Sequence, residues 1–245
     1  MSKKKLIVIG GPTASGKTAL SIQLAKQFNT DVLSGDSRQF YREMSIGTAK
    51  PTAEEMNGVK HYFIDSHSIQ DELSAAKYAE QAEALLNELF QSHDVVILTG
   101  GSGMFMDALC YGLDDIPHDP LVQDVFNARF KAEGLLPLVA ELQEKDPEFA
   151  AQADLSNPVR VIRALEVIQL TGTKFSALRK NQRKEHPFEI HYFAIHVERE
   201  QLYDRINRRV DLMLDAGLEE EVRALIPCRD LKSLQTVGYS EWFDY

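Results

Sequence analysis

The fold prediction rests on the stretch Gly11-Pro12-Thr13-Ala14-Ser15-Gly16-Lys17-Thr18. It follows an apolar run at residues 6–10 and precedes a helix-like run at residues 19–26, so a glycine-rich turn joins an expected strand to an expected helix. In this context the pattern G-x-x-x-x-G-K-[ST] is an ATP-type P-loop, whose N–H groups cradle two linked phosphates. Lys17 would reach the outer phosphate oxygens, and the Thr18 hydroxyl would bind Mg²⁺. The complete match disfavours a glycine turn without a phosphate role.

Composition restricts the class of protein. The 245 residues, 44% of them hydrophobic, suit one large α/β domain or a core with an insertion. No apolar run approaches the roughly 18 residues that span a bilayer, and residues 1–5 pass into the first strand without a signal-type region. Cys110 and Cys228 are far apart and the seven histidines are scattered, so neither set predicts a metal site. We expect a monomeric cytoplasmic protein with no membrane contact.

Two further strand ends carry the candidate chemistry. Residues 31–37 predict a short parallel strand, and Asp36 at its carboxyl end should face the P-loop. A carboxylate that only caps the next turn is the alternative reading of Asp36. The apolar run at residues 95–99 predicts a buried strand, and it ends in Thr-Gly-Gly at 99–101, where a standard P-loop NTPase has a metal-binding Asp. Hydrolysis by a metal-held water is therefore disfavoured, and Asp36 is the main candidate acid or base.

Periodicity and turn residues place the other elements. In chain order we expect a strand at 61–65, a helix at 74–90, helices at 120–133, at 135–145 and from 158, a strand at 191–197, helices at 198–216 and 218–225, and a helix-like pattern at 235–243. The helix at 198–216 should bury Leu202, Ile206, Val210 and Met213. These elements predict an α/β fold with a P-loop NTPase-like parallel sheet flanked by helices, at residues 1–116 and 188–245. A helical insertion domain is expected at 117–187.

Charge is unevenly distributed along the chain. The net charge of −10 argues against generic nucleic-acid binding over the whole surface. From residue 158 to residue 184, however, seven basic residues stand against one acid, Glu166. A solvated helical face explains such a tract about as well as a site for a polyanion, so charge alone leaves both open.

Seven motifs occur in one order along nearly the whole chain. They are the P-loop at 11–18, Asp36-Ser37-Arg38-Gln39 with Tyr41, Ile46-Gly47-Thr48-Ala49-Lys50-Pro51, Gly100-Gly101-Ser102-Gly103, residues 160–167, Arg205-Ile206 with Arg209, Met213 and Gly217, and Val237-Gly238-Tyr239. Together they resemble the tRNA dimethylallyltransferase (tRNA isopentenyltransferase) family. The P-loop is shared by many families, whereas the second and third motifs are far more specific.

The resemblance implies a tRNA modification reaction. A dimethylallyl group would pass from dimethylallyl diphosphate to the exocyclic N6 amine of an adenosine in certain tRNAs, releasing diphosphate. That adenosine lies next to the anticodon on its 3′ side, so the expected partner is the anticodon stem-loop. Asp36 would take the proton of the attacking amine. Lys17 and Mg²⁺ on Thr18 would stabilise the leaving diphosphate.

The resemblance also implies site residues. The catalytic ones are Lys17, Asp36, Ser102 and Arg209, with the diphosphate in the P-loop. The tRNA-contacting ones are Asp36, Ser37, Arg38, Gln39, Ser102, Gln123, Val159, Arg160, Val161, Ile162, Arg163, Gln235, Thr236, Val237, Gly238, Tyr239 and Ser240. Within this set Gln39 would hold the flipped adenine, because an amide can pair with an adenine edge.

The chain departs from the family pattern at several positions. Ser102 stands where the family usually has Thr, Phe105 replaces a Tyr, and Gln123 falls where many members have an Arg that contacts tRNA. The family's C-terminal segment, with a Lys-Arg-Gln and a later Trp and Arg, has no counterpart in these 245 residues. A P-loop kinase of small molecules or nucleotides is the alternative function, and a non-catalytic tRNA-binding module with a relic P-loop is a third.

Overall fold

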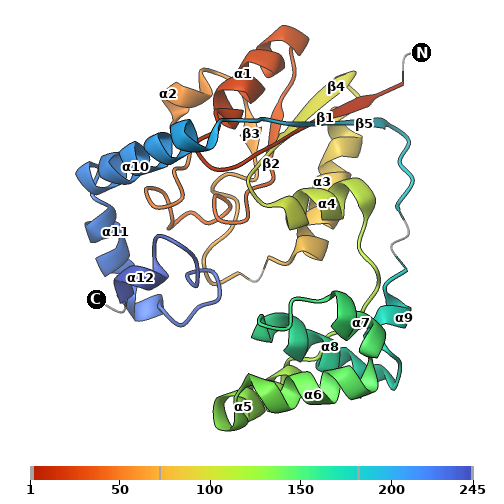
Figure 1. Ribbon diagram of the computed structural model, residues 1–245. Coiled ribbons are helices and arrows are strands. Elements are labelled where there is room, and N and C mark those ends of the chain that lie inside the picture. Colours follow the sequence, from red (N-terminus) through yellow and green to blue (C-terminus); the bar gives the residue numbers. More distant parts are fainter. Residues whose placement is uncertain (1–2, 72, 181–182, 244–245) are drawn as a thin grey trace. The chain divides into compact units, whose positions relative to one another are not determined.

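The computed structural model describes residues 3–71, 73–180 and 183–243 (Figure 1). Contacts divide the chain into two compact units. The larger comprises Met1–Gly112 with Lys184–Tyr245, and the smaller is Leu113–Arg183. Among the described residues, no helix has both the length and the apolar character that crossing a membrane requires.

The larger unit is built on a parallel sheet. In the described residues this sheet has five strands in the order β3-β2-β4-β1-β5. The strands are β1 Lys5–Gly10, β2 Val32–Ser34, β3 His61–Tyr62, β4 Val95–Thr99 and β5 Glu189–Ala194. Because every pair is parallel, the segments that follow β1, β2 and β4 all emerge at one edge of the sheet. This is the predicted α/β class with a parallel sheet.

Helices cover both faces of this sheet (Figure 1). Leu6, Val8 and Leu98 pack against α3 (Ala75–Leu89) and α4 (Gly103–Tyr111), whereas Ile9 and Ile97 pack on the side of α1 (Lys17–Phe28). Alternate strand residues point to opposite faces, so burial on both sides explains why the central strands read as continuous apolar runs. The remaining helical elements of this unit are α2 Ala53–Met56, α10 Arg199–Asp215, α11 Leu218–Leu225, a 3₁₀ turn at Ile226–Cys228, and α12 Ser240–Phe243.

The segments predicted at 31–37 and 235–243 form the shorter elements β2 and α12, and three other predictions differ from the structure more markedly. The strand expected at 61–65 ends at Tyr62, because Phe63 and Asp65 have φ of 60° and 53°, which are left-handed and cannot continue a strand. The strand expected in the core at 191–197 is the edge strand β5, on which Phe193 is 57% exposed. No residue of helix α10 is fully buried. The prediction that it buries a stripe of apolar side chains at Leu202, Ile206, Val210 and Met213 is therefore wrong.

In the described part of the smaller unit all regular secondary structure is helical. Its helices are α5 Pro120–Glu133, α6 Leu135–Lys145, α7 Pro147–Gln152, α8 Pro158–Thr171 and α9 Phe175–Leu178. Prolines at the first helical position of α5, α7 and α8 follow side-chain caps at Asp119, Asp146 and Asn157. The unit has its own core, formed by Phe126, Leu138, Leu142, Val161 and Leu165 among others.

Candidate active site

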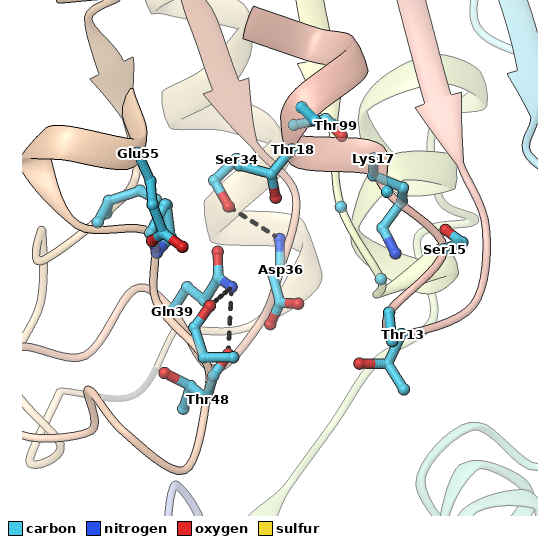
Figure 2. Close-up of a pocket in the computed structure, with 18 of the residues that line it drawn as sticks. Thr13, Ser15, Lys17, Thr18, Ser34, Asp36, Gln39, Thr48, Glu55 and Thr99 are labelled. Atoms are coloured by element: carbon cyan, nitrogen blue, oxygen red, sulfur yellow. Dashed lines mark hydrogen bonds between the residues drawn. The ribbon is translucent and has the colours of Figure 1, made fainter. Parts of the chain in front are cut away.

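One cavity of about 460 Å³ lies at the carboxyl edge of the sheet in the larger unit (Figure 2). Ligands of parallel α/β sheets bind at this edge, outside the ends of the strands. The cavity is lined by Thr13, Ala14, Ser15, Gly16, Lys17, Thr18, Ala19, Ile22, Ser34, Asp36, Gln39, Thr48, Ala49, Pro51, Glu55, His61, Ile64, Thr99, Gly100, Gly101 and Arg209.

The P-loop presents donors to this cavity. Gly16, with φ of 95°, precedes α1 and provides no side-chain cap, so the first N–H groups of the helix are available to a ligand. The Lys17 ammonium donates to the carbonyls of Gly11 (2.9 Å) and Pro12 (2.7 Å). The Ser15 hydroxyl is buried and has no hydrogen-bond partner among the described residues. Free amides, a cation and an unpaired hydroxyl at one helix N-terminus fit a diphosphate.

Asp36 reaches the cavity because β2 runs close beside β4. The Gly35 N–H donates to the Thr99 carbonyl at 2.7 Å. A Cβ on Gly100 would lie 2.4 Å from the carbonyl carbon of Gly35, so this approach requires glycine at position 100. Asp36 Oδ1 accepts from the Arg38 N–H at 3.0 Å, which is a turn cap. The carboxylate therefore caps the turn and also lines the cavity, so capping is not its only contact, and its role as acid or base stays a prediction.

The cavity holds two cations and is electrostatically suited to an anion. Burial lowers the pKa of Lys17; Asp36 opposes this shift and Arg209 adds to it. Burial also lowers the pKa of Arg209, although a guanidinium remains protonated. Arg209 comes from α10 and donates to the Thr13 hydroxyl (3.1 Å) and to the Ala49 carbonyl (3.3 Å). A bound polyphosphate would favour the charged form of both cations.

Gln39 faces the cavity from the segment after β2, with its amide orientation fixed. Nε2 donates to the carbonyls of Thr48 and Ala49, both at 3.2 Å (Figure 2). Since both N–H groups are used, the amide presents Oε1 as an acceptor. An acceptor at this position suits an N–H donor on a nucleobase edge.

Comparison with known proteins identifies the family. A model of the IPP transferase family matches residues 39–245, which is most of the chain. The chain belongs to the IPP transferase family.

Individual IPP transferases support this assignment. A tRNA dimethylallyltransferase of Cytophaga hutchinsonii is 49% identical over 99% of this chain and 80% of its own length. The full-length tRNA isopentenylpyrophosphate transferase of Bacillus halodurans superposes with a TM-score of 0.67, at 40% identity over 99% of this chain and 77% of that one. A eukaryotic dimethylallyltransferase solved while acting on tRNA gives a TM-score of 0.73, at 26% identity over 93% of this chain and 57% of that one. The predicted family and fold class are confirmed, and the kinase alternative is set aside.

In this IPP transferase, Lys17, Asp36 and Arg209 of the predicted catalytic set line one cavity, together with Thr18. Ser102, the fourth predicted catalytic residue, is not among the residues that line the cavity; it directly follows Gly101, which is. Its hydroxyl donates to the Ser37 hydroxyl and accepts from the Ser37 N–H, both at 2.9 Å. Ser102 and Ser37 therefore join the segments after β4 and β2, which brings two predicted tRNA-contacting residues into contact with each other.

Other predicted tRNA-contacting residues of the larger unit form a second group. The Arg38 guanidinium donates to the Ser233 carbonyl at 2.7 Å, and so ties the segment after β2 to the segment before α12. In that segment Gln235 and Val237 are exposed, whereas Tyr239 is fully buried. Thr236, Gly238 and Ser240 are half-buried.

In the helical unit, the predicted tRNA-contacting residues divide by exposure. Val159 is 70% exposed, Arg160 is exposed and Gln123 is half-buried, whereas the side chains of Val161 and Ile162 belong to the unit's core. The Arg163 guanidinium donates to buried Glu166 (2.9 Å) and to the Ile116 carbonyl (3.1 Å), so it supports the fold. Of the basic residues in the tract 158–184, those with exposed side chains are Arg160, Lys174, Arg179, Lys180, Arg183 and Lys184.

Several residues of the site were not predicted as site residues. Thr48 and Ala49 lie in a motif that the sequence singled out, but the use of their carbonyls by Gln39 and Arg209 has no side-chain pattern to reveal it. Glu55 and His61 line the cavity with no motif of their own. Their proximity comes from the parallel sheet, not from spacing along the chain.

Proposed function

We propose that the chain transfers a dimethylallyl group from dimethylallyl diphosphate to the exocyclic N6 amine of the adenosine on the 3′ side of the anticodon. The observation that carries this proposal is that the phosphate cradle, Asp36 and the Gln39 acceptor open onto one cavity. Family membership supplies the reaction class, and the relatives named above are tRNA dimethylallyltransferases. A cytoplasmic monomer acting on the anticodon stem-loop is part of the proposal.

In the proposed transfer, one group of residues acts on the prenyl donor and another acts on the adenosine acceptor. The C–O bond of the donor breaks and its electron pair stays on the diphosphate, whose growing charge faces the P-loop amides, Lys17 and Arg209. The amine nitrogen forms the new bond to the prenyl carbon, and its proton passes to the Asp36 carboxylate. Gln39 Oε1 would orient the adenine edge, and alignment of a weak aryl amine with the prenyl carbon supplies much of the rate.

Mg²⁺ is the metal proposed for this site. Among the described residues, no group of three or more His, Cys, Asp or Glu side chains could hold a metal by itself. Thr18 lines the cavity at the P-loop, and its hydroxyl is the protein oxygen that would hold Mg²⁺, a cation that prefers oxygen ligands. When bound, the ion would withdraw charge from the leaving diphosphate.

Labelled substrates test the proposed function. The chain is incubated with tRNA and dimethylallyl diphosphate carrying label in the prenyl group, and in parallel with labelled ATP and small acceptors. We expect label on the tRNA from the prenyl donor. A stem-loop with guanosine at the 3′ neighbour of the anticodon is the matched control and should remain unlabelled. Phosphate transfer from ATP without prenyl incorporation would contradict the proposal.

A further inference from the structure

We propose that Glu221 is a positioning residue of the prenyl-transfer site, acting through the backbone of loop 45–49. Glu221 lies on α11 and is absent from the residues that line the cavity. The inference rests on the function proposed above, and its test is designed so that the two can fail separately.

The Glu221 carboxylate holds three consecutive backbone amides. Its Oε2 accepts from the N–H groups of Ser45 (3.0 Å) and Ile46 (2.8 Å), and its Oε1 accepts from the Gly47 N–H (3.1 Å). Successive N–H groups that converge on one carboxylate form an anion-binding concavity, and charge-assisted hydrogen bonds are the stronger kind. One side chain from a distant part of the chain thus fixes the course of the loop.

Tyr239 completes this attachment. Its hydroxyl donates to Glu221 Oε1 at 2.6 Å, and its ring packs against Gly47 so closely that a Cβ there would lie 2.6 Å from a ring carbon. Tyr239 is fully buried, and burial together with the bond to Glu221 raises the pKa of its hydroxyl. Tyr239 therefore acts inside the protein as a partner of Glu221, although its motif had predicted a contact with tRNA.

The other side of the same loop faces the cavity. The carbonyls of Thr48 and Ala49 receive both N–H groups of Gln39, and the Ala49 carbonyl also receives Arg209. Ala49 has φ of 47°, a left-handed conformation that is uncommon for a residue with a side chain. Strain of this kind persists where surrounding contacts over-determine the backbone, and it is concentrated at functional sites.

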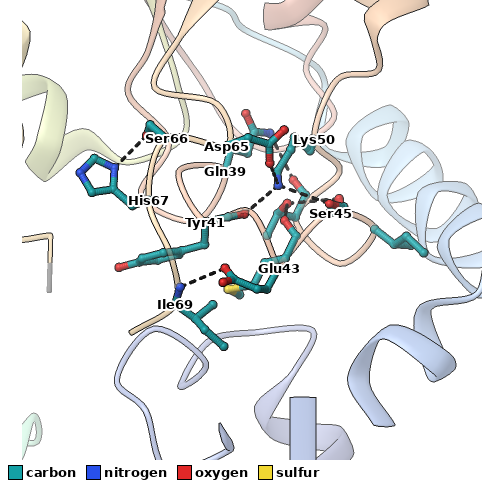
Figure 3. A network of polar contacts seen from close by, with 12 residues as sticks. Gln39, Tyr41, Glu43, Ser45, Lys50, Asp65, Ser66, His67 and Ile69 are labelled. Atoms are coloured by element: carbon teal, nitrogen blue, oxygen red, sulfur yellow. Dashed lines mark hydrogen bonds and ion pairs between the residues drawn. The ribbon is translucent and has the colours of Figure 1, made fainter. Parts of the chain in front are cut away.

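Lys50 anchors the far end of the loop (Figure 3). Its ammonium, on a side chain only 6% exposed, donates to the Tyr41 carbonyl at 2.7 Å and pairs with Asp65. The loop is therefore held at its start by Glu221 and at its end by Lys50. Between these anchors lie the carbonyls that orient Gln39 and Arg209.

This arrangement explains how a residue outside the cavity would affect the reaction. If the amides at 45–47 are released, the carbonyls at 48 and 49 no longer fix the Gln39 amide. Gln39 could then turn its NH₂ toward an adenine amine, which would put donor against donor. A small loss of alignment at the reacting atoms costs a large factor in rate.

Glu221→Ala removes the acceptor, and Glu221→Gln keeps its shape but replaces one oxygen by a donor. Glu220→Gln, at an exposed position one residue away on α11, is the matched control. Each change is made in the parent chain and in Gln39→Ala, which gives a double-mutant cycle. The readout is the single-turnover rate of prenyl transfer at saturating tRNA and dimethylallyl diphosphate, with folding checked by thermal melting.

We expect Glu221→Ala to lower this rate by about 10- to 100-fold in the parent chain. In the Gln39→Ala background the same change should lower it by less than about threefold, because Gln39 is gone and only the contact of the Ala49 carbonyl with Arg209 is left to disturb. Equal losses in both backgrounds, or a normal rate in a folded Glu221→Ala chain, would overturn the inference. If Glu221→Ala does not fold, the same cycle with Glu221→Gln decides it. If neither the parent nor Glu220→Gln labels tRNA, the proposed function itself fails and the inference fails with it.

Discussion

Replacing Asp36 with Asn would remove the proposed base while preserving the local backbone. The Asn side-chain oxygen can still accept from the Arg38 N–H, which is the bond that Asp36 Oδ1 now makes at 3.0 Å. The volume is nearly unchanged, so the close contact between Gly35 and Gly100 should persist. The substitution therefore separates the proton-accepting role of Asp36 from its role as a turn cap.

The size of the effect follows from the two roles of the carboxylate. A positioned general base contributes about 10²- to 10⁴-fold, so we expect Asp36→Asn to lose at least ~100-fold in single-turnover transfer. This corresponds to about 2.7 kcal/mol in the activation barrier. Asp36 also interacts with Lys17 and Arg209, and its neutralisation leaves the cavity more positive. The donor diphosphate should therefore bind at least as tightly as in the parent chain.

Titration calorimetry with dimethylallyl diphosphate and rapid-quench transfer to tRNA measure these two quantities. Asp211→Asn makes the same chemical change on an exposed position of α10 and should leave both near the parent values. A loss of less than about tenfold in Asp36→Asn would refute the general-base role, since it falls below the range for such catalysis. Loss of donor binding in proportion to the rate would assign Asp36 to binding instead.

Three further predictions concern other parts of the chain. Gly100→Ala should lower the melting temperature and slow transfer, because the new Cβ would lie 2.4 Å from the backbone of Gly35. Thermal melting and the single-turnover transfer rate measure these two effects. An unchanged rate would contradict the prediction. Arg160→Ala should reduce the slope of log K against log salt for tRNA binding by about one, whereas an unchanged slope would show that this exposed side chain contacts no phosphate. Cys110 should resist alkylation at pH 8 in the folded chain, because burial raises its pKa to about 12, and half-exposed Cys228 should react first by mass spectrometry.

Much of the fold could be predicted where local chemistry determines it. The strand at 95–99 and the helices at 120–133, 135–145 and 218–225 were predicted with the bounds that the structure shows. A side-chain cap followed by proline favours a helix start, as at Asp119 and Pro120, and a short apolar run flanked by turn residues favours a buried strand. For these elements, the local sequence is enough to predict both the type of element and its bounds.

Predictions were wrong where burial depends on what lies beside an element. The segment around Phe193 has a strand-like pattern, but the pattern does not tell an edge strand from a central one. The apolar positions of α10 similarly predicted a buried stripe, yet no residue of this helix is fully buried in the described chain. The periodicity of apolar residues indicates which side of an element faces the protein, whereas the degree of burial of that side depends on tertiary contacts.

In the candidate site, too, residues with a local sequence signal could be predicted, whereas residues brought together only by folding could not. The positions of the P-loop and Asp36 at the cavity could be predicted, because the P-loop is a local motif and Asp36 directly follows a predicted strand. Glu221 was not predicted, because its acceptors and its partner Tyr239 are brought together by folding and it lies in a helix rich in acids. A carboxylate that serves distant amides has no spacing that would reveal it.

The proposal of Asp36 as the base is supported by steric exclusion at the strand ends. A carboxylate cannot replace Gly100, because any side chain there meets the backbone of Gly35. At the preceding position the Thr99 hydroxyl donates to the Ile9 carbonyl within the sheet. Of the described carboxylates that line the cavity, Glu55 accepts from the Thr52 N–H in a capping box and is engaged at α2. The ends of β2 and β4 thus lie so close together that the end of β4 has no room for a carboxylate. The same close contact places the end of β2, with Asp36, at the cavity.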